Sequence, residues 1–477
     1  MTGIDRHALP PLAVDLDGTL IRTDLLHETS LLLLRQSPLS LLSLPSWLAR
    51  GKAWMKQQIA ERVEPDYSRL PYDPDLLAWL RQERAQGRRL VLCTASDARL
   101  ARGVADHLQL FDEVMASDGQ TNLSSENKAQ ALAGRFGEQG FDYAGNSSDD
   151  LPVWRRARAA VVVAARPPVA RAAAEQGRVE REFPAPQATL RVWLKALRLH
   201  QWLKNLLVFL PLMGAFRFDG AVLVASVLAF FAYGLCASSV YILNDLMDLD
   251  SDRAHPRKRL RPFASGLISV PRGLVAMLLL LSGAVLLSLQ LPAAFQLALC
   301  VYYALTLAYT FFLKQRVLVD CVTLGMLYTL RIIAGVAATG LQHSFWFLAF
   351  PLFLFLSLAF VKRYSELQAM ISLGRTSAAG RGYLASDAPL VMAMGVASGF
   401  CAVLLLALYL NSEAVVQNYT HPQRLWLTLP VVLYWIGRMW MQAQRGHLSD
   451  DPVVFAVKDR YSLACAVLFG ALLVVAH

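Results

Sequence analysis

The sequence predicts a two-part protein, with a soluble α/β domain over residues 1–185 and an all-α transmembrane bundle of nine helices over residues 186–477. In the first part, short apolar strands alternate with helical stretches, which is the pattern of a parallel-sheet α/β domain. From Arg191 onward, long apolar runs dominate, and about 20 apolar residues are enough to cross a bilayer as a helix. The composition, 55% hydrophobic and 17% charged over 477 residues, agrees with a membrane protein that carries a soluble domain.

The α/β pattern rests on four strands and on the helical stretches between them. The predicted strands are PLAVDL (11–16), RLVLCTAS (89–96), FDYAGNS (141–147) and AAVVVA (159–164), with helices over DARLARGVADHL (97–108) and NKAQALAGRFG (127–137). Residues 169–187 then lose apolar periodicity and contain two prolines, which indicates a linker.

Residues 24–93, between the first two strands, leave room for a small helical cap. The stretch 30–56 combines many leucines with basic and tryptophan residues, a composition typical of a segment that lies against a membrane. The alternative is a cap that only covers a cleft in the α/β domain.

The membrane part contains nine candidate spans, at about 203–217, 220–243, 272–290, 293–313, 318–339, 344–361, 389–411, 424–441 and 460–476. The first is short and interrupted by Pro211. Connections after the second, fourth, sixth and eighth spans carry fifteen Lys and Arg residues, whereas the opposite connections carry only Arg217 and Arg424. The positive-inside rule then places the N-terminal domain in the cytoplasm and the C-terminus in the periplasm, in a multi-pass protein of the inner membrane.

An acidic cluster follows the second span: Asn244, Asp245, Asp248 and Asp252. The aspartates are spaced by three and four residues, so a helix that carries them places all three carboxylates on one face, with Asp250 off that face. Carboxylates at a membrane boundary are costly unless something positive compensates them. Mg²⁺, bound through a few carboxylates and substrate phosphates, is the natural compensation. We expect Asp245, Asp248 and Asp252 to be metal ligands, assisted by Asn244.

Basic residues come directly after this cluster: Arg253, Arg257, Lys258, Arg259 and Arg261. Carboxylates mixed with cations beside a membrane cavity favour a diphosphate-binding active site over the alternative, a solvated acidic helix end. Arg253, Lys258 and Arg261 are the candidates to neutralise substrate phosphate.

Two further cations are candidate site residues. Arg331 lies in the middle of the fifth span, where an ionisable side chain usually faces an interior cavity. Lys204 follows Trp202 at the start of the first span, and interfacial anchoring explains both residues as well as phosphate binding does.

Four strings in the membrane part closely resemble the UbiA superfamily of intramembrane prenyltransferases, in particular its decaprenyl-phosphate phosphoribosyltransferase branch. They are RLHQWLKN (198–205), NDLMDLDSDRAHPRKRLRPFASG (244–266), YTLRIIAG (328–335) and KRYSEL (362–367). The resemblance implies a UbiA-type helical bundle that transfers phosphoribosyl from phosphoribosyl diphosphate (PRPP) to a polyprenyl phosphate, with Mg²⁺.

The loop after the sixth span departs from the aromatic prenyltransferases of that superfamily, which carry a second aspartate-rich motif there. Here the residues are Lys362, Arg363 and Tyr364, without such a motif. Cations suit a lipid monophosphate, which needs direct neutralisation and no second metal. The alternative is that Lys362 and Arg363 are ordinary positive-inside residues.

The N-terminal part resembles a haloacid dehalogenase (HAD) phosphatase, a Rossmann-like α/β fold with a small cap. DLDGTL (15–20) matches the first motif, Thr94 the second, Lys128 the third and GNSSDD (145–150) the fourth. The resemblance implies that Asp15 is the nucleophile, that Asp17 is the acid/base, and that Thr94 and Lys128 bind the phosphoryl group. It also implies a Mg²⁺ site formed by Asp15, Asp17, Asn146 and Asp150 (or Asp149), although Asn146 stands where the family usually has an acidic residue.

Together these features predict a bifunctional membrane enzyme. The transferase makes polyprenyl-phosphoryl-5-phosphoribose, and the HAD domain removes its 5-phosphate, on a route toward a lipid-linked arabinofuranose donor. No nucleic-acid partner is expected, and the polyprenyl length and oligomeric state are left open. The second enzyme hypothesis is a UbiA-type enzyme that uses a prenyl diphosphate, with an inactive or regulatory HAD domain. A membrane transporter or scaffold is the non-enzyme alternative.

Overall fold

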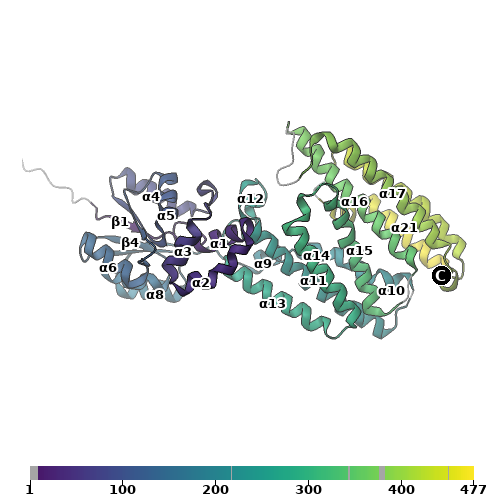
Figure 1. Cartoon of the computed structure of the whole chain (residues 1–477), viewed down its shortest axis with the longest axis horizontal. Helices are drawn as coiled ribbons and strands as arrows, with labels where there is room; N and C mark the ends of the chain where they lie inside the picture. The colour runs from purple at the N-terminus through teal and green to yellow at the C-terminus, as the bar shows by residue number, and fades with distance from the viewer. Residues whose placement is uncertain (1–8, 216, 342–343, 375–381, 449–450) are drawn as a thin grey trace, which may run out of the picture. The chain divides into compact units, whose positions relative to one another are not determined.

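The computed structural model describes residues 9–215, 217–341, 344–374, 382–448 and 451–477 (Figure 1). They form two compact units, one of Met1–Leu197 with Tyr241–Ala276 and the other of Arg198–Val240 with Met277–His477. The boundary near residue 185 stays a prediction, and in this division the segment Tyr241–Ala276, which contains the acidic cluster, groups with the α/β domain.

A six-stranded parallel sheet forms the centre of the first unit, in the order β3-β2-β1-β4-β5-β6. The strands are β1 (Leu12–Val14), β2 (Leu90–Asp97), β3 (Glu113–Ser117), β4 (Asp142–Gly145), β5 (Ala159–Val163) and β6 (Arg178–Phe183). In the central register, Ala13 of β1 lies between Val91 of β2 and Tyr143 of β4. Four of these strands confirm the predicted ones, and the parallel-sheet, HAD-like fold is confirmed with them.

The predicted linker at 169–187 is wrong. Most of it forms α8 (Pro167–Gln176) and β6, which pairs with β5 at the edge of the sheet. The strand β6 was not predicted because its sequence lacks an apolar pattern. Its charged residues are all exposed: Arg178, Glu180, Arg181 and Glu182. Charged side chains are typical of an edge strand, where they discourage pairing with another chain.

Alternating side chains of the strands build two apolar layers, one on each face of the sheet. Leu12 and Val14 pack with α4 (Pro74–Ala85) and α5 (Ala98–Leu108), whereas Ala13 packs on the opposite side (Figure 1). The opposite layer includes residues of α6 (Ser125–Phe136), α7 (Leu151–Arg156) and α8. This period of two is the direct consequence of the extended backbone.

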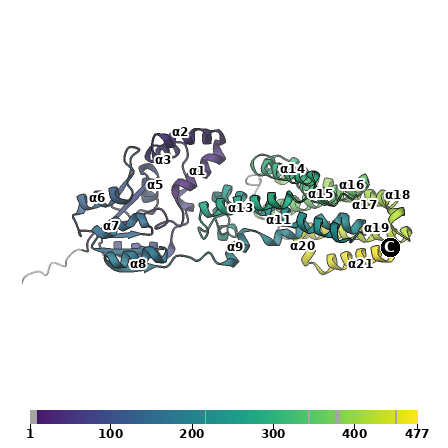
Figure 2. The same ribbon diagram turned by 90° about the horizontal axis from the view of Figure 1, so that it is seen from below.

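The predicted cap is helical and consists mainly of α1 (Leu25–Gln36), α2 (Leu44–Ala49) and α3 (Lys52–Ala60) (Figure 2). Leu33, Ile59 and Val63 form its small core. Between α1 and α2, a 3₁₀ segment (Pro38–Ser43) exposes Leu39 by 79% and Leu42 by 80%.

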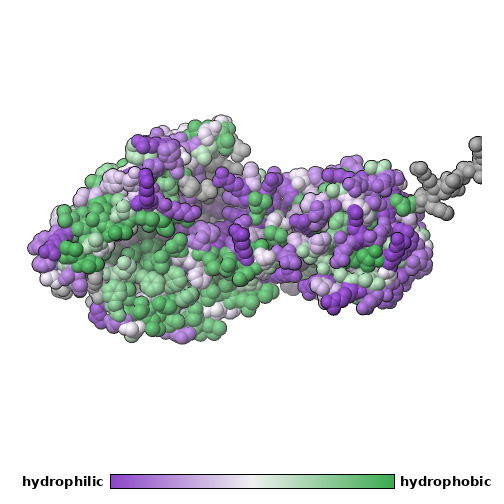
Figure 3. All heavy atoms as spheres, turned by 180° about the vertical axis from the view of Figure 1, so that it is seen from behind, coloured by the Kyte–Doolittle hydropathy of each residue, from purple (hydrophilic) through white to green (hydrophobic). Residues whose placement is uncertain are grey.

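Six helices of the described chain are long and apolar enough to cross a membrane: Gly220–Met247 (α11), Val270–Ser288 (α13), Ala293–Phe311 (α14), Val319–Thr339 (α15), Phe345–Ser372 (α16) and Ala385–Leu410, which includes α17 (Ala388–Leu410). The pair α20 (Pro452–Lys458) and α21 (Arg460–Ala476), bent by 80°, makes a seventh if it counts as one span. In the view of Figure 3, hydrophobic residues gather over the helical bundle.

The remaining expected spans do not reach this length. The first is divided into a 3₁₀ segment (Leu199–Phe209) and the short α10 (Leu210–Gly214), because Pro211 lacks the amide that would continue one helix. The eighth is α19 (Thr428–Gln444), of 17 residues. Nine spans therefore stay a prediction, of which the described helices support six directly.

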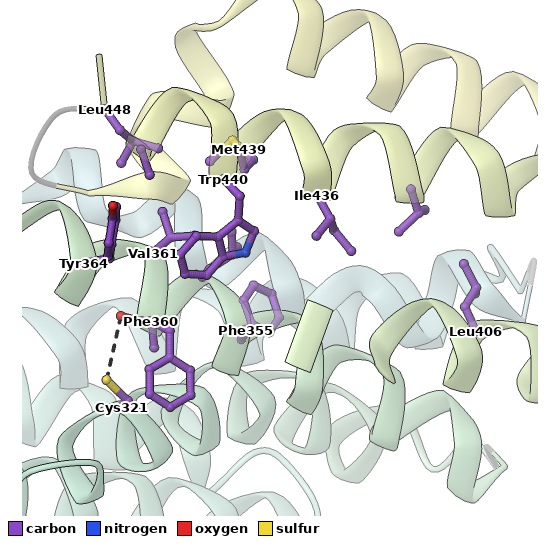
Figure 4. Close-up of a cluster of buried hydrophobic side chains, with 14 of the residues drawn as sticks. Cys321, Phe355, Phe360, Val361, Tyr364, Leu406, Ile436, Met439, Trp440 and Leu448 are labelled. Atoms are coloured by element: carbon purple, nitrogen blue, oxygen red, sulfur yellow. Dashed lines mark hydrogen bonds between the residues drawn. The ribbon is translucent and has the colours of Figure 1, made fainter. Parts of the chain in front are cut away.

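The core of the bundle is built around α16 (Figure 4). Trp440 of α19 packs beside Phe360 and donates its indole N–H to Ser357 Oγ at 3.1 Å. Ser357 in turn donates to the carbonyl of Gly395 on α17 at 2.7 Å. A Cβ at Gly395 would lie 2.2 Å from the Trp440 ring, so a glycine is needed for this close packing.

Candidate functional site

The first candidate site lies where β1 and β2 end at the carboxyl edge of the sheet. Asp15 and Asp17 follow β1 directly, and Thr94 lies within β2. Lys128 of α6 donates to Asp15 at 2.8 Å and to the Tyr143 hydroxyl at 2.9 Å. The structure therefore brings together the residues of the first three predicted motifs. Burial raises the pKa of Asp15, and the adjacent Lys128 ammonium opposes that shift by favouring the ionised carboxylate.

Asp17 is held by donors from two segments, the start of the cap and β2. One carboxylate oxygen accepts the backbone N–H of Leu25 at 2.8 Å, at the start of the cap. The other accepts the Ser96 hydroxyl at 2.6 Å and the Thr94 hydroxyl at 3.5 Å. Burial, with the Asp24 charge adding to it, raises the pKa of Asp17. A raised pKa suits a carboxyl group that has to carry a proton.

The fourth motif folds around Asp150. One of its oxygens accepts the backbone N–H groups of Asn146 and Ser147, both at 2.9 Å, and the other accepts the Tyr143 hydroxyl at 2.7 Å. Asp150 therefore holds the loop, and it also lies 3.6 Å from Lys128. Its exposed neighbour Asp149 lines the cavity in front of the site.

Asn146 lies against the loop of the first motif. Gly18 has φ +75°, and a Cβ there would lie 2.0 Å from the Asn146 side-chain nitrogen. Only glycine tolerates both this backbone and this approach. The predicted ligands Asn146, Asp15 and the Asp17 backbone carbonyl would all offer oxygen atoms, the donor type that Mg²⁺ prefers. Among the residues that the structure describes, no group of three or more His, Cys, Asp or Glu side chains is arranged to hold a metal ion.

A cavity of about 610 Å³ opens in front of Asp15 and Asp17. Its cap side carries Arg22, His27, Lys52 and Lys56, and another wall is formed by Ser269, Val270 and Pro271. Lys56 donates to the carbonyl of Ala95 at 2.6 Å. Burial lowers the pKa of this lysine. The basic side chains on this side suit an anionic substrate, and the second wall comes from the start of α13, a candidate membrane span.

The second candidate site is the acidic segment at the end of α11. The helix ends at Met247, Asp248 adopts φ −103° and ψ 14°, and a short helix α12 (Leu249–Ala254) follows. The expectation of one continuous helix is thus wrong at Asp248. The backbone bonds from Asp248 N–H to Asn244 and from Asp252 N–H to Asp248 nevertheless keep the spacing of four across the break.

Arg261 joins two of the predicted metal ligands. One of its terminal nitrogens lies 3.2 Å from Asp245 and 2.7 Å from Asp252, and both aspartates are buried. Asp250 lies elsewhere, in a small cavity lined by Glu28 and Arg35 of the cap, as expected for a residue off the face. Lys258 is exposed on the next turn. The carboxylate set suits a hard cation in its chemistry, and a guanidinium supplies the positive charge in this structure.

Arg253, predicted to neutralise phosphate, is fully engaged by protein groups. Its two terminal nitrogens donate to the two oxygens of Glu28 on α1 at 3.0 Å and 2.7 Å, and its Nε donates to the Ala264 carbonyl at 2.9 Å. These contacts favour a role in holding the segment over direct binding of a substrate.

In the second unit, Arg331 of α15 faces the interior, as expected for a mid-span cation. It donates to Asn205 at 3.0 Å and to the Tyr302 hydroxyl at 3.2 Å, and it lies over the rings of Tyr233, Tyr302 and Tyr328. An aromatic cage of this kind stabilises a guanidinium by cation–π attraction.

Lys204 and Lys362 are electrostatic neighbours, together with Asp451 and Glu366. Lys204 forms a salt bridge with Asp451 and lies 5.5 Å from the centre of the Tyr328 ring, which Arg331 also contacts. The second unit thus brings three predicted cations to one region of its interior.

Arg363 and Tyr364, by contrast, have structural partners. Arg363 is buried in salt bridges with Asp320 and Glu366, and Asp320 also accepts the Tyr383 hydroxyl at 2.7 Å. Tyr364 accepts a hydrogen bond from Gln368 at 2.7 Å. Both side chains are buried within the bundle core, so these contacts do not support the predicted role in phosphate binding.

Several residues of these sites were not predicted from the sequence: Glu28, Ser96, Tyr143, Asn205 and Asp451. No local motif marks Glu28, because its partner Arg253 is 225 residues away along the chain. Tyr143 was read only as part of a predicted strand. Asn205 and Ser96, however, belong to strings that carried the family resemblances, RLHQWLKN and LCTAS. These two residues could have been found by considering every polar residue of the matched strings as a candidate site residue.

Two family descriptions match the chain. The UbiA prenyltransferase family matches residues 206–475, and the haloacid dehalogenase-like hydrolase family matches residues 12–155. The resemblances drawn from the motif strings are confirmed at this level.

Curated relatives cover different parts of the chain. The uncharacterized protein y4nM of Sinorhizobium fredii is 39% identical over 98% of this chain and 91% of its own length. The nodulation protein NoeC of Azorhizobium caulinodans is 35% identical over 59% of this chain and 92% of its length. The decaprenyl-phosphate phosphoribosyltransferase of Mycolicibacterium smegmatis is 40% identical, over 37% of this chain and 57% of its length.

Among solved structures, a UbiA homolog from Archaeoglobus fulgidus bound to DMAPP and Mg²⁺ matches 60% of this chain and 98% of its own. The identity is 17% and the TM-score is 0.47.

Proposed function

Since the chain belongs to the UbiA prenyltransferase family and carries a haloacid dehalogenase-like domain, we propose that it transfers 5-phosphoribosyl from PRPP to a polyprenyl phosphate and then removes the 5-phosphate. The choice of donor rests on the relatives named decaprenyl-phosphate phosphoribosyltransferase, which are 35–40% identical over the part they share. The product of the two steps is polyprenyl-phosphoryl-ribose.

The observation that carries the transfer half is the pairing of acidic and basic groups in the segment 245–261. Asp245, Asp248 and Asp252 are the groups to hold Mg²⁺ on the PRPP diphosphate, where the ion would stabilise the departing charge. Arg261, which contacts two of these carboxylates, would pair with the diphosphate oxygens. In the transfer, a lipid phosphate oxygen bonds to the anomeric carbon as the bond to diphosphate breaks.

The cations of the second unit suit the lipid monophosphate. Lys204 and Lys362 lie near one another, and Arg331 shares the Tyr328 ring with Lys204. A monophosphate needs direct neutralisation by ammonium or guanidinium groups, and no second aspartate-rich motif accompanies them in the sequence.

In the phosphatase half, the Asp15 carboxylate attacks the phosphorus of the 5-phosphate, and the ester oxygen leaves as the ribose hydroxyl with a proton from Asp17. Asp17 then accepts a proton from the water that hydrolyses the aspartyl-phosphate, so that inorganic phosphate leaves and Asp15 is regenerated. Lys128 neutralises the phosphoryl oxygens, and Asp15, Asp17 and Asn146 are the groups to hold Mg²⁺, which would lower the charge barrier to the attack.

A lipid-borne substrate for this half is supported by the walls of its cavity. Ser269–Pro271 line it, and Val270 is the first residue of a candidate membrane span. The exposed Leu39 and Leu42 of the cap suit contact with a lipid surface. We propose a multi-pass inner-membrane protein with both active sites on the cytoplasmic side and the C-terminus in the periplasm, in accord with the positive-inside bias.

Mass spectrometry of lipids after incubation with PRPP, polyprenyl phosphate and Mg²⁺ tests both steps. Wild type should give polyprenyl-phosphoryl-ribose and release both diphosphate and inorganic phosphate. Asp15→Asn should accumulate the 5-phosphorylated lipid, while Asp118→Asn, a change at an exposed surface carboxylate, should behave as wild type. If wild type and Asp15→Asn yield the same 5-phosphorylated lipid, the phosphatase step is disproved.

The second candidate, a prenyltransferase that uses a prenyl diphosphate, is kept because the matching family is described as a prenyltransferase family. A mixture of PRPP, a prenyl diphosphate and an aromatic acceptor separates the two. Consumption of PRPP alone supports the proposal, and a prenylated aromatic product without phosphoribosyl lipid overturns it.

A further inference from the structure

A buried ion pair joins the cap of the HAD domain to the acidic segment within the first unit. Glu28 and Arg253 are 225 residues apart, and both oxygens of the carboxylate accept from the guanidinium, at 2.7 Å and 3.0 Å. Their side chains are only 6% and 5% exposed. A buried charge that loses its partner is strongly unfavourable, so this bidentate pair fixes the relative position of the two segments.

Each member of the pair is itself anchored. Glu28 accepts the Thr23 hydroxyl at 2.7 Å, and Arg253 donates to the Ala264 carbonyl at 2.9 Å. The guanidinium therefore spans from α12 to the turn that follows the basic string. That turn is further closed by the Ser265 hydroxyl, which donates to the Arg261 carbonyl at 2.8 Å.

A second contact reinforces the pair. Gly266 has φ +74°, and a Cβ at this position would lie 2.7 Å from Arg22 Cβ and 2.9 Å from the Arg22 carbonyl oxygen. The turn therefore packs directly on the backbone of residue 22, which only glycine permits. Arg22 is fixed in turn by its salt bridge to Asp73 at 3.0 Å.

These contacts reach both candidate sites. On one side, the turn clamped by Arg253 directly follows Arg261, which contacts Asp245 and Asp252. On the other, Glu28 lies in the first turn of α1, whose first N–H, from Leu25, is donated to Asp17. A short series of contacts thus connects the acid/base of the phosphatase half with the carboxylates of the transferase half.

We propose that Glu28, a residue of the HAD domain, is a positioning residue for the transferase site, and that it acts through Arg253, which is not a phosphate ligand. The proposal rests on the proposed role of Asp245 and Asp252 in transfer. The HAD domain is then part of the transferase scaffold, independently of its own catalysis.

Three variants and one matched control test this. Glu28→Gln, Arg253→Gln and the double variant should each lower kcat/KM for transfer by a similar amount, on the order of 10- to 100-fold, as for a small misplacement of reacting groups. The effects should not add, because both changes break the same contact. The control is Glu83→Gln, which breaks another buried pair of the α/β domain, with Arg88 at 2.7 Å, and should leave transfer unchanged.

Hydrogen exchange gives a readout that does not depend on the substrate. Both Glu28→Gln and Arg253→Gln should speed amide exchange in residues 253–266 and 25–36, and Glu83→Gln should not. Transfer is measured with whichever donor wild type consumes, so a wrong donor assignment leaves this test standing.

Three outcomes would overturn the proposal. A loss at Arg253→Gln at least tenfold greater than at Glu28→Gln would identify Arg253 as a direct substrate ligand. Normal transfer by Glu28→Gln with unchanged exchange would remove the positioning role. An equal loss at Glu83→Gln would attribute the effect to general destabilisation of the domain.

Discussion

The substitution Arg363→Met distinguishes two possible roles of this residue, binding of the lipid phosphate and a structural ion pair. The sequence offered Arg363 as a ligand of the lipid phosphate, whereas the structure buries it between Asp320 and Glu366, beside the ring of Tyr383 at 5.3 Å. Methionine keeps an unbranched side chain of similar reach, so the change removes charge with little loss of volume. We expect a loss of stability and no specific effect on binding of the lipid.

The expected loss of stability follows from the buried Asp320 carboxylate, which loses its cationic partner. Asp320 is completely buried, and after the substitution it keeps the Tyr383 hydroxyl at 2.7 Å but loses its cationic partner. Removing one member of a buried pair costs about 3–5 kcal/mol. With about 2–4 °C of Tm per kcal/mol for 150–250 residues, Tm should fall by about 6–20 °C.

Thermal unfolding of the purified protein in detergent, followed by tryptophan fluorescence, measures this shift. The double variant Asp320→Asn/Arg363→Met should recover most of it, because no uncompensated charge is then buried. Lys362→Met should change the free energy of unfolding by less than about 1 kcal/mol, as for a partly exposed side chain, but raise the KM for polyprenyl phosphate. An unchanged Tm with a raised lipid-phosphate KM at Arg363→Met would refute the structural role.

Two further predictions concern the metal sites. Asp245→Asn should abolish transfer while the protein stays folded and inserted, and Asp250→Asn should be mild, since its side chain lies in the cavity beside Glu28; equal losses in the lipid product assay would contradict this geometry. Asn146→Asp should lower the Mg²⁺ concentration for half-maximal phosphate release by roughly tenfold, because it adds a charged oxygen ligand. A Mg²⁺ titration that does not move would show that residue 146 is not a ligand.

The α/β half was largely predictable because its signals are local. Four strands were apparent as apolar runs, and their alternation in the sheet follows from the extended backbone alone. The failures also have physical causes. The edge strand β6 exposes charged residues and needs no apolar pattern, and the break at Asp248 depends on packing of the next segment that no local propensity encodes.

The candidate sites were also predictable only in part. Asp15, Asp17, Thr94 and Lys128 converge as their motif order predicts, since each follows or lies within an element at one edge of the sheet. The roles of single cations were much less predictable. A positive charge in a basic string favours phosphate binding, but only burial and partner geometry separate a ligand from a structural ion pair.

The basic string that follows the acidic cluster illustrates this limit. Arg253 and Arg261 are eight residues apart in one highly specific motif, and both are natural candidates for a phosphate. In the structure, Arg261 contacts Asp245 and Asp252, the carboxylates that hold Mg²⁺ in the proposed reaction. Arg253 already satisfies its donors with Glu28 and Ala264, so binding a phosphate would strand a buried carboxylate in the HAD cap. A residue that matches such a motif can therefore either bind the ligand or hold two segments of the protein together. The two roles can be distinguished only when the partner of each charged side chain is known.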